Sequence, residues 1–508
     1  MDLKLKLRPN FFFSFLIFIF LFQKPDLGSA SGPKCISTER QALLTFKQSL
    51  TDPSGRLSSW SGLDCCKWRG VGCDRRTSHV IKIDLRNPNQ TLRPYDHWEV
   101  YDMGGLGGKI NPSLTRLKFL SYLDLSSNDF NFTAIPDFIG QMVSLRYLNL
   151  SSSTFLGEVP GSLGNLSKLE ILDLYAQTFS SDGPNSYTLY TLEATNLGWL
   201  SGLSSSLTYL NMGYVSMRRV GETWLEEFSK LTKLKELHLF NCELNKLPLS
   251  LPSSANLKHL EVLDLSRNPL SSPIPNWLYD LTNLRKLYLQ EDNLEGLSPS
   301  GFKKLKLLNT LDLSNNGFSG ELPVVFGDLS QLKYLDLSFN SFQGQVHKFL
   351  DALSNNKGNS LVSLHLYSNN LNGTLPESLG ALRNLQILDL SENSFTGSIP
   401  SLVGNMASLK ELYLSRNSMK GKIPQSVGKL QRLETLHLSF NMFSGAIPQS
   451  LGAISTLETL ALSYNNLEGR IPTNLKFKDP YIYFGNELLC GKPLPKKCPR
   501  KQETVIVN

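Results

Sequence analysis

The chain has 508 residues, of which 51 are basic and 44 acidic, giving a formal net charge of +7 at pH 7. So mild a positive charge argues against a nucleic-acid-binding protein. Six of the seven cysteines lie toward the two ends of the sequence, a distribution that favours disulfide-bonded terminal caps on a secreted protein.

Residues 1–30 have the pattern of a secretory signal peptide. Basic residues precede an apolar run over 11–22, and the small residues at 28–30 suit a cleavage site. The run is too short to span a bilayer, so an uncleaved membrane anchor is the weaker alternative. We therefore expect a secreted, extracellular protein with no membrane span beyond the signal peptide.

Residues 31–79 are expected to form an N-terminal cap. Their four cysteines allow three pairings. We favour Cys35–Cys65 with Cys66–Cys73, because adjacent cysteines do not pair readily and short loops close easily. Trp60 and Trp68 are expected to cover the first repeat.

A helix is predicted inside this cap. The stretch Thr38-Glu-Arg-Gln41 resembles a capping box and predicts a helix that opens there. The apolar face of this helix would hold Ala42, Leu43, Phe46 and Leu50.

From about residue 80 to residue 475 the sequence repeats the pattern LxxLxxLxLSxNxFxGxIPxxLGxL. The position that ends each LxLxxN segment recurs mostly every 24 residues. It is occupied by Asn128, Ser153, Gln177, Val215, Cys242, Asn268, Asp292, Asn316, Asn340, Asn369, Asn393, Asn417, Asn441 and Asn465. With a divergent copy at 80–88 this makes about fifteen repeats. The period and the leucine spacing are the signature of a leucine-rich-repeat solenoid.

Each part of the repeat has a predicted structural role. Alternation in LxL predicts short parallel strands on a concave face, with leucines inward and the residue between them outward. The asparagines are expected to bond the backbone of neighbouring turns. Glycine and proline in GxIP favour an irregular or 3-10 return rather than a long helix.

Three insertions interrupt the period, near 86–104, 178–200 and 347–359. Loops on a rigid scaffold often carry recognition. The first insertion is unusually aromatic, with Tyr95, His97, Trp98 and Tyr101, although packing against the flank of the solenoid is an equal alternative.

Residues 476–508 are expected to form a C-terminal cap and tail, with a disulfide Cys490–Cys498. Five Asn-x-Ser/Thr sequons predict glycosylation and agree with passage through the secretory pathway. They lie at Asn89, Asn131, Asn149, Asn165 and Asn372. A glycan at Asn149, between two strand leucines, would block the concave face locally.

No pattern for enzyme chemistry is found. The glycines of 104–108 lack the spacing and the Ser/Thr of a phosphate-binding loop, and HExxH and GxSxG are absent from the sequence. The histidines do not cluster with cysteines as metal ligands. We therefore expect no catalytic residues, no metal and no cofactor.

Function is instead expected on the outward positions of the strands. Exposed aromatic and arginine residues are typical of binding hot spots. The candidates for ligand or partner binding are His365, Tyr367, Tyr413, Arg416, His437, Phe440 and Tyr464. Five of them, from Tyr413 onward, are expected to form one patch over three successive turns. The alternative is that they are ordinary solvated positions.

The ends of the chain resemble the plant leucine-rich-repeat receptor-like proteins of immunity, in the group of the ethylene-inducing-xylanase receptors and the apple scab-resistance proteins. The match rests on three segments, Cys35-Ile-Ser-Thr-Glu-Arg-Gln-Ala-Leu-Leu-Thr-Phe-Lys, Asp64-Cys-Cys-Lys-Trp-Arg-Gly-Val-Gly-Cys73 and Gly485-Asn-Glu-Leu-Leu-Cys. The resemblance covers essentially all of 35–498.

This resemblance implies a recognition protein in defence signalling. It would bind a microbial or endogenous protein or peptide ligand and act with a receptor-kinase adaptor or co-receptor. Family members usually have about twice as many repeats and a membrane helix, which this sequence lacks. We expect a secreted, apoplastic protein, or a plasma-membrane location if the sequence is part of an anchored receptor. The alternatives are a secreted inhibitor of microbial cell-wall-degrading enzymes, similar to the polygalacturonase inhibitors, or a soluble decoy.

Overall fold

The computed structural model describes residues 35–88, 104–176, 192–251, 256–356, 358 and 360–499, together with the backbone of 180–181 and 187–188. The predicted signal peptide, the sequon at Asn89, the aromatic residues of the first insertion and part of the second insertion lie outside these residues. The chain divides into two compact units, Met1–Glu193 and Ala194–Asn508.

In the first unit the repeats form a sheet that is parallel from β3 onward, and β2 pairs antiparallel with β3. Its strands are β2 (Val71–Cys73), β3 (Val80–Asp84), β5 (Tyr122–Asp124), β6 (Tyr147–Asn149) and β8 (Ile171–Asp173).

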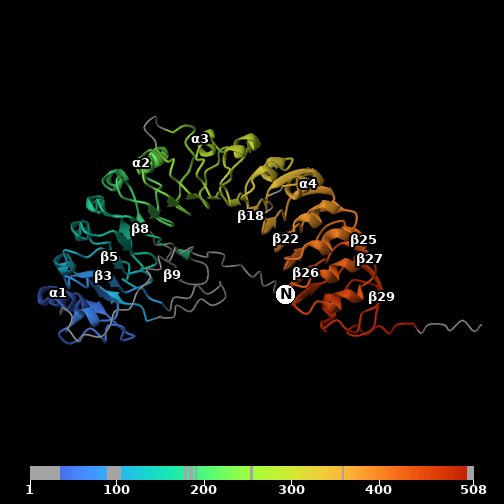
Figure 1. Cartoon of the computed structure of the whole chain (residues 1–508), viewed down its shortest axis with the longest axis horizontal. Helices are drawn as coiled ribbons and strands as arrows, with labels where there is room; N and C mark the ends of the chain where they lie inside the picture. Colours follow the sequence, from blue (N-terminus) through green and yellow to red (C-terminus); the bar gives the residue numbers. More distant parts are fainter. Residues whose placement is uncertain are drawn as a thin grey trace, which may run out of the picture. The chain divides into compact units, whose positions relative to one another are not determined.

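In the second unit a longer sheet is parallel throughout (Figure 1). Its strands are β12 (Tyr209–Asn211), β13 (Glu236–His238), β14 (Val262–Asp264), β15 (Lys286–Tyr288), β16 (Thr310–Asp312), β18 (Tyr334–Asp336), β20 (Ser363–His365), β22 (Ile387–Asp389), β24 (Glu411–Tyr413), β26 (Thr435–His437) and β28 (Thr459–Ala461). Leucines pair with leucines across each strand pair, as Leu388 does with Leu412. These leucines are buried, so the predicted solenoid with inward leucines is confirmed.

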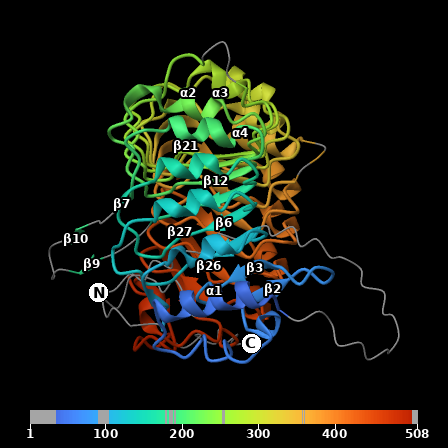
Figure 2. The ribbon, with the colours of Figure 1, turned by 90° about the vertical axis from the view of Figure 1, so that its left-hand side faces the viewer.

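The return segments are mostly short 3-10 helices, and within each unit many of them contact the helix of the next turn, as η3 contacts η4 and η10 contacts η11 (Figure 2). They are η2 (Pro112–Arg116), η3 (Asp137–Gln141), η4 (Gly161–Asn165), η5 (Gly198–Leu203), η6 (Gly221–Thr223), η7 (Pro299–Lys304), η8 (Val324–Asp328), η9 (Glu377–Ala381), η10 (Ser401–Asn405), η11 (Gln425–Lys429) and η12 (Gln449–Ala453). Many begin directly after a proline, whose fixed φ suits the start of such a turn.

The sequence analysis did not foresee additional sheets in the second unit. The residues that follow the asparagine position pair in parallel with the same segment of the next turn. One sheet holds β17 (Ser319–Gly320), β19 (Ser341–Gln345), β21 (Asn370–Thr374) and β23 (Ser394–Thr396). Another holds β25 (Lys420–Lys422), β27 (Met442–Ala446), β29 (Asn466–Arg470) and β30 (Leu488–Cys490). Strands β19, β21, β23 and β29 each bury one apolar side chain between exposed neighbours, as β23 buries Phe395.

Among the described residues, three short strand pairs and three α-helices accompany the repeats. The pairs are β1 (Leu50–Thr51) with β4 (Gly107–Gly108), β7 (Gly157–Glu158) with β11 (Leu192–Glu193), and β9 (Ser180–Ser181) with β10 (Tyr187–Thr188). The helices are α2 (Trp224–Ser229), α3 (Asn276–Tyr279) and α4 (His347–Ser354). Helix α4 lies in the predicted third insertion and buries Phe349, Leu350 and Leu353, so this insertion serves packing.

The asparagines bond neighbouring turns as predicted. Asn316 donates from Nδ2 to the carbonyl oxygens of Leu289 at 2.7 Å and Ser314 at 3.0 Å. Its Oδ1 accepts the N–H of Leu294 at 2.9 Å. The same bonds recur along the second unit, and we call the side chains at this position the asparagine column. The column continues to Asn486 in the C-terminal cap, one turn beyond the last repeat that the sequence analysis counted.

The N-terminal cap contains α1 (Ser37–Gln48), η1 (Cys65–Lys67) and the disulfides Cys35–Cys65 and Cys66–Cys73. This pairing is the one that the sequence favours. Trp60 and Trp68 are buried and stacked, with ring centroids 5.5 Å apart.

The predicted capping box is wrong. Helix α1 begins at Ser37, one residue before Thr38, and no side chain caps its N-terminus. Asp64 instead accepts the N–H groups of Cys35 and Cys66 at 3.4 and 3.3 Å, so contacts across the cap fix the start of the helix. Leu50 lies in β1, outside the helix.

The C-terminal cap adds η13 (Pro480–Ile482), strand β30 and the disulfide Cys490–Cys498. Within the described ranges, none of the helices is both long and apolar enough to cross a bilayer.

Candidate recognition surface

The seven predicted binding residues all lie in the second unit, on the face of the sheet that the leucines leave open. Leu412 and Leu414 are buried, which turns Tyr413 between them to the opposite side. Strand pairing places Tyr413 beside His437, and His437 beside Ala461. The register therefore brings side chains from successive turns into contact.

Three candidates occupy a left-handed backbone position. Arg416, Phe440 and Tyr464 each precede the asparagine of their turn and have φ values of 55°, 55° and 53°. Few residues other than glycine and asparagine adopt this conformation easily. The backbone N–H groups of Arg416 and Phe440 each donate to the next turn, at 3.0 Å. This turn therefore repeats the same geometry and projects each side chain in the same direction.

These three side chains form a row with Phe484 from the C-terminal cap, which we call the aromatic row. The Arg416 guanidinium carbon lies 5.0 Å from the centroid of the Phe440 ring. Phe440 and Tyr464 stack at 4.5 Å with 14° between their planes, and Tyr464 meets Phe484 edge to face at 5.5 Å. The rings of Phe440, Tyr464 and Phe484 are 42%, 45% and 54% exposed, so they pack on one another and not into the core.

Gly485 supports the end of the aromatic row. Its φ is +74°, and a Cβ there would lie 2.7 Å from Cδ1 of Tyr464. The Tyr464 ring therefore rests directly on the backbone of the cap. Sequence reasoning missed Phe484, because the cap follows the last repeat at a shorter spacing than 24 residues.

Tyr413 and His437 form a second contact beside the row. Their rings meet edge to face with centroids 5.0 Å apart, and the Tyr413 hydroxyl donates to Glu411 at 2.7 Å. Burial lowers the pKa of His437, which favours the neutral ring. The structure thus brings the five predicted patch residues together over three turns, as two adjoining groups.

His365 and Tyr367 belong to a separate group. Nε2 of His365 lies 2.6 Å from the Ser363 hydroxyl, and its ring lies 5.6 Å from that of Tyr334. Tyr367 packs edge to face on Phe339 at 4.4 Å. The turn that holds Asp389 and Glu392 separates this group from the aromatic row. An ion pair of 3.6 Å joins Glu392 of that turn to Arg416 of the aromatic row.

The open face also carries carboxylates that the sequence analysis treated as bland. Asp312 and Asp336 lie side by side on β16 and β18, and Asp389 follows on β22. Burial raises the pKa of each of these carboxyl groups, and the neighbouring carboxylates of Asp336 and Asp389 add to this for Asp312 and Asp336 respectively. The face therefore changes along the second unit. Carboxyl groups predominate at β16–β22, with His365 of β20 between Asp336 and Asp389, and aromatic rings with the guanidinium of Arg416 follow at β24–β28.

The first unit carries another polar cluster on its sheet. Arg86 forms a bidentate ion pair with Asp84 and donates to the hydroxyl of Tyr122 at 2.8 Å. The Tyr122 ring stacks on Tyr147 at 4.1 Å. These groups satisfy one another, which indicates a structural role.

The asparagines of the described sequons differ in their exposure to solvent. Asn131, Asn165 and Asn372 are exposed. Asn149 is half-buried, accepts the N–H of Ser151 at 2.9 Å and donates to the Tyr147 hydroxyl at 3.3 Å. Glycosylation remains a prediction, and these contacts favour the three exposed sites.

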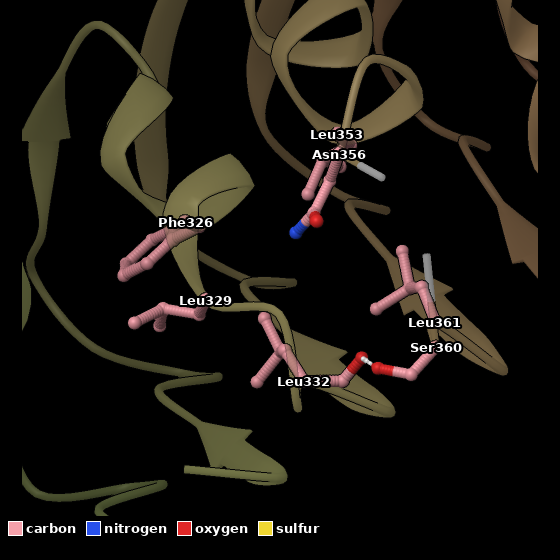
Figure 3. Close-up of a pocket in the computed structure, with 7 residues that line it drawn as sticks. All are labelled: Phe326, Leu329, Leu332, Leu353, Asn356, Ser360 and Leu361. Atoms are coloured by element: carbon pink, nitrogen blue, oxygen red, sulfur yellow. Dashed lines mark hydrogen bonds between the residues drawn. The ribbon is translucent and has the colours of Figure 1, made fainter. Parts of the chain in front are cut away.

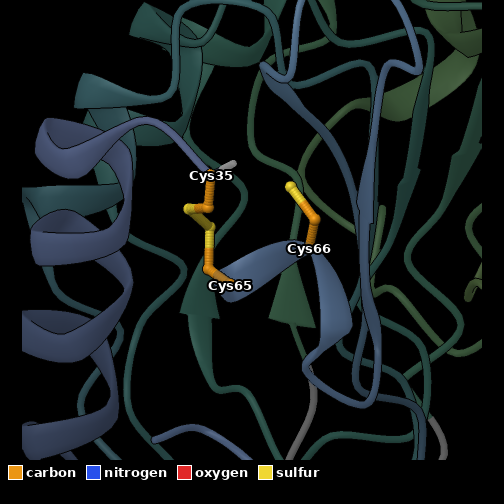
Figure 4. A group of neighbouring side chains, drawn as sticks. All are labelled: Cys35, Cys65 and Cys66. Carbon is orange, nitrogen blue, oxygen red and sulfur yellow. A yellow bond between two sulfur atoms is a disulfide. The ribbon is translucent and has the colours of Figure 1, made fainter. Parts of the chain in front are cut away.

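One group of sulfur atoms has the proximity of a metal site. Cys35, Cys65 and Cys66 lie together, but Cys35 is bonded to Cys65, as Figure 4 shows, and Cys66 is bonded to Cys73. Oxidised sulfurs do not provide the thiolates that metals require. These cysteines therefore stabilise the N-terminal cap through two disulfide bonds.

A small cavity lies below α4 (Figure 3). Most of its lining is apolar, from residues that include Phe326, Leu332 and Leu353. Its polar side chains are satisfied by the backbone, since Asn356 donates to Gly327 at 2.7 Å and Ser360 to Leu332 at 2.8 Å. The cavity offers no polar group for a ligand and belongs to the packing of the insertion.

The family models that match are all leucine-rich-repeat models. A leucine rich repeat N-terminal domain matches residues 36–74, leucine rich repeats match 144–166, 232–294, 282–342 and 331–356, and a leucine-rich repeat region matches 357–475.

Similar sequences are plant receptor-like proteins. Receptor-like protein EIX1 of Solanum lycopersicum is 38% identical over 280 residues, and receptor-like protein EIX2 is 39% identical over 271 residues. The matches cover 52% and 51% of this chain and 24% of each relative. The chain thus matches about a quarter of the length of these relatives.

Similar structures are plant receptor ectodomains. One is the ectodomain of the Arabidopsis thaliana receptor kinase GASSHO1/SCHENGEN3 in complex with CASPARIAN STRIP INTEGRITY FACTOR 2, with a TM-score of 0.63, 30% identity and coverage of 77% of this chain and 47% of that one. Another is the plant peptide hormone receptor RGFR1 in complex with RGF2, with a TM-score of 0.57, 28% identity and coverage of 80% and 62%.

Proposed function

Since this chain is a leucine-rich-repeat protein related to the plant receptor-like proteins, we propose that it is an extracellular recognition protein that binds a protein or peptide ligand on the open face of its second unit. The aromatic row carries this proposal. Three rings and a guanidinium are held in register by the backbone yet stay about half exposed.

Folding does not explain why large side chains occupy these positions. Phe440 and Tyr464 sit at φ values near +55°, where a residue other than glycine or asparagine costs about 1–2 kcal/mol. Some other turns hold serine or asparagine there, as at Ser127 and Asn315, whereas Arg267 and Phe339 occupy the same position elsewhere. Aromatic and arginine side chains on a rigid surface are the anchors that protein interfaces use, because little freedom is lost on binding.

The change of charge along the face supports an extended ligand with two different ends. A basic group of the ligand would lie over Asp312, Asp336 and Asp389, and an apolar group would lie on the aromatic row. The span from β16 to β28 crosses six strand spacings of about 4.8 Å, or roughly nine residues of extended peptide.

The setting of this function is also a proposal. The signal-like residues 1–30, the exposed sequons and the disulfide-bonded caps support an extracellular, apoplastic site of action. By analogy with receptor-like relatives, a receptor kinase would serve as adaptor or co-receptor in defence signalling, and the protein would lie at the plasma membrane if the sequence is part of an anchored receptor.

The test selects linear peptides of about twelve residues from a phage library on the purified protein. Their affinities are then compared between the wild type, Phe440→Ala and Leu402→Ala, which removes an equally exposed apolar side chain from η10. We expect at least a thirtyfold loss for Phe440→Ala and none for Leu402→Ala. Equal affinities for all three would refute the proposed site. Inhibition of a fungal polygalacturonase by the wild type would instead favour the inhibitor alternative.

A further inference from the structure

The asparagine column contains one member that does not fit the chemistry of the others. Asp292 holds the place between Asn268 and Asn316 and is completely buried. Its Oδ1 accepts the N–H of Asn268 at 2.7 Å, and its own N–H donates to Oδ1 of Asn316 at 3.2 Å. Its Oδ2 is buried and has no hydrogen-bond partner.

Every other polar member among the described residues places a donor in the column. Asn268 donates from Nδ2 to Leu239 at 2.9 Å, and Asn316 donates to Leu289 at 2.7 Å. Where the column lacks asparagine the donor persists, because the Ser153 hydroxyl donates to Leu125 at 2.8 Å and the Cys242 thiol donates to Met212 at 3.1 Å. The feature that these turns share is thus a hydrogen-bond donor directed at backbone carbonyl oxygens.

An ionised carboxylate cannot supply that hydrogen, whereas a carboxylic acid can. By the equivalence of the turns, Oδ2 of Asp292 takes the place of Nδ2 in its neighbours and faces carbonyl oxygens. We propose that Asp292 is protonated in the folded protein and donates from Oδ2–H, so that this joint between β14, β15 and β16 loosens when the proton is lost.

The charges around Asp292 agree with this assignment. The charged groups that act on it are the carboxylates of Asp264 on β14, Asp312 on β16 and Glu291 in its own turn. Burial first, and then these three carboxylates, raise the pKa of Asp292 to about 9, against the lowering effect of the Asn268 N–H. Cations nearby are already engaged, since Arg267 pairs with Glu291 at 3.1 Å and His238 lies 3.8 Å from Asp264.

The sign of the pH effect follows from proton linkage. Between the ordinary pKa of 3.8 and the folded value of about 9, the folded state holds a proton that the unfolded state has released. Stability therefore falls as pH rises through this window and levels off above it. A single proton changes the unfolding constant by at most tenfold per pH unit.

The test measures urea unfolding from pH 5 to pH 10 for the full protein, Asp292→Asn and Asp328→Asn, the last of which alters an exposed carboxylate on η8. We expect the unfolding constant of the wild type to rise relative to that of Asp292→Asn, by up to tenfold per pH unit. The ratio of the wild type to Asp328→Asn should stay flat, and the infrared band of a protonated carboxyl at pH 7 should weaken only in Asp292→Asn.

Parallel pH profiles for the wild type and Asp292→Asn would overturn the proposal. If Asp292→Asn does not fold, Asn316→Asp tests the same chemistry in the next turn. That variant should be markedly less stable at pH 8 than at pH 5 relative to the wild type. Equal losses of stability at the two pH values would contradict the need for a donor in the column.

Discussion

Replacing Phe440 by asparagine separates the stability of the aromatic row from its proposed role in binding. The change removes a ring stack with Tyr464, worth about 0.5–1.5 kcal/mol, and a cation–π contact with Arg416, worth about 0.5–1 kcal/mol at an exposed site. Asparagine adopts the left-handed conformation readily, so at φ +55° the change stabilises the folded state by about 1–2 kcal/mol relative to phenylalanine. These effects nearly cancel, so we expect the free energy of unfolding to change by no more than about 1 kcal/mol.

Binding should respond differently. A ring at the centre of an interface typically contributes 2 kcal/mol or more, so selected peptides should bind Phe440→Asn roughly thirtyfold more weakly. Calorimetric titration gives the affinity, and urea unfolding gives the stability. Phe318→Ala is the contrasting control, because it removes a fully buried ring and should cost about 3–5 kcal/mol of stability. The reasoning is refuted if Phe440→Asn loses more than about 2 kcal/mol of stability or leaves peptide binding intact.

Three further predictions concern the column, the cap and the histidines. Asn417→Ala removes the hydrogen bonds of the side chain to the carbonyl oxygens of Leu390 and Leu414 and to the N–H of Phe395. The free energy of unfolding in urea should fall by about 2–4 kcal/mol. A fall of less than about 1 kcal/mol would contradict the role of the column. Gly485→Ala should displace the Tyr464 ring and weaken peptide binding. Gly469→Ala is the control, because Gly469 has a similar positive φ but open space where the Cβ would lie. Equal effects of the two changes on peptide binding would count against the contact between Tyr464 and Gly485. Burial lowers the pKa of His238, but its pairing with Asp264 and Glu236 outweighs this effect and raises the pKa to about 9. In an NMR titration His238 should therefore ionise near pH 9, and the pKa of His437, which burial lowers, should lie below its ordinary value. The reverse order of the two pKa values would contradict these assignments.

Much of the fold was predictable because the repeat expresses it locally. Alternating residues such as Leu388 and Leu390 fix the inward face of a strand, and Asn393 fixes the bonds between turns. The additional sheets had a weaker signal of the same kind. In four of these strands a single buried residue, such as Phe395, lies between exposed neighbours, but so few residues do not predict a strand without its partners.

The candidate surface was predictable only in part. The repeat predicted that Arg416, Phe440 and Tyr464 lie on the same face of the sheet, because each directly precedes an asparagine of the column. Phe484 was missed since the cap breaks the 24-residue spacing, and the contact of Tyr464 with Gly485 depends on that cap. Burial raises the pKa of Asp312 and of Asp336, and carboxyl groups on other strands add to this rise, which a single repeat does not reveal.

The most direct test of the proposed function is hydrogen exchange of the protein with and without a saturating selected peptide. Binding on the open face predicts slower exchange over 411–416, 435–440, 459–464 and 482–486, the segments that carry the aromatic row and its neighbours. Protection confined to the return helices at 425–429 and 449–453 would contradict the account, because those helices lie away from the open face.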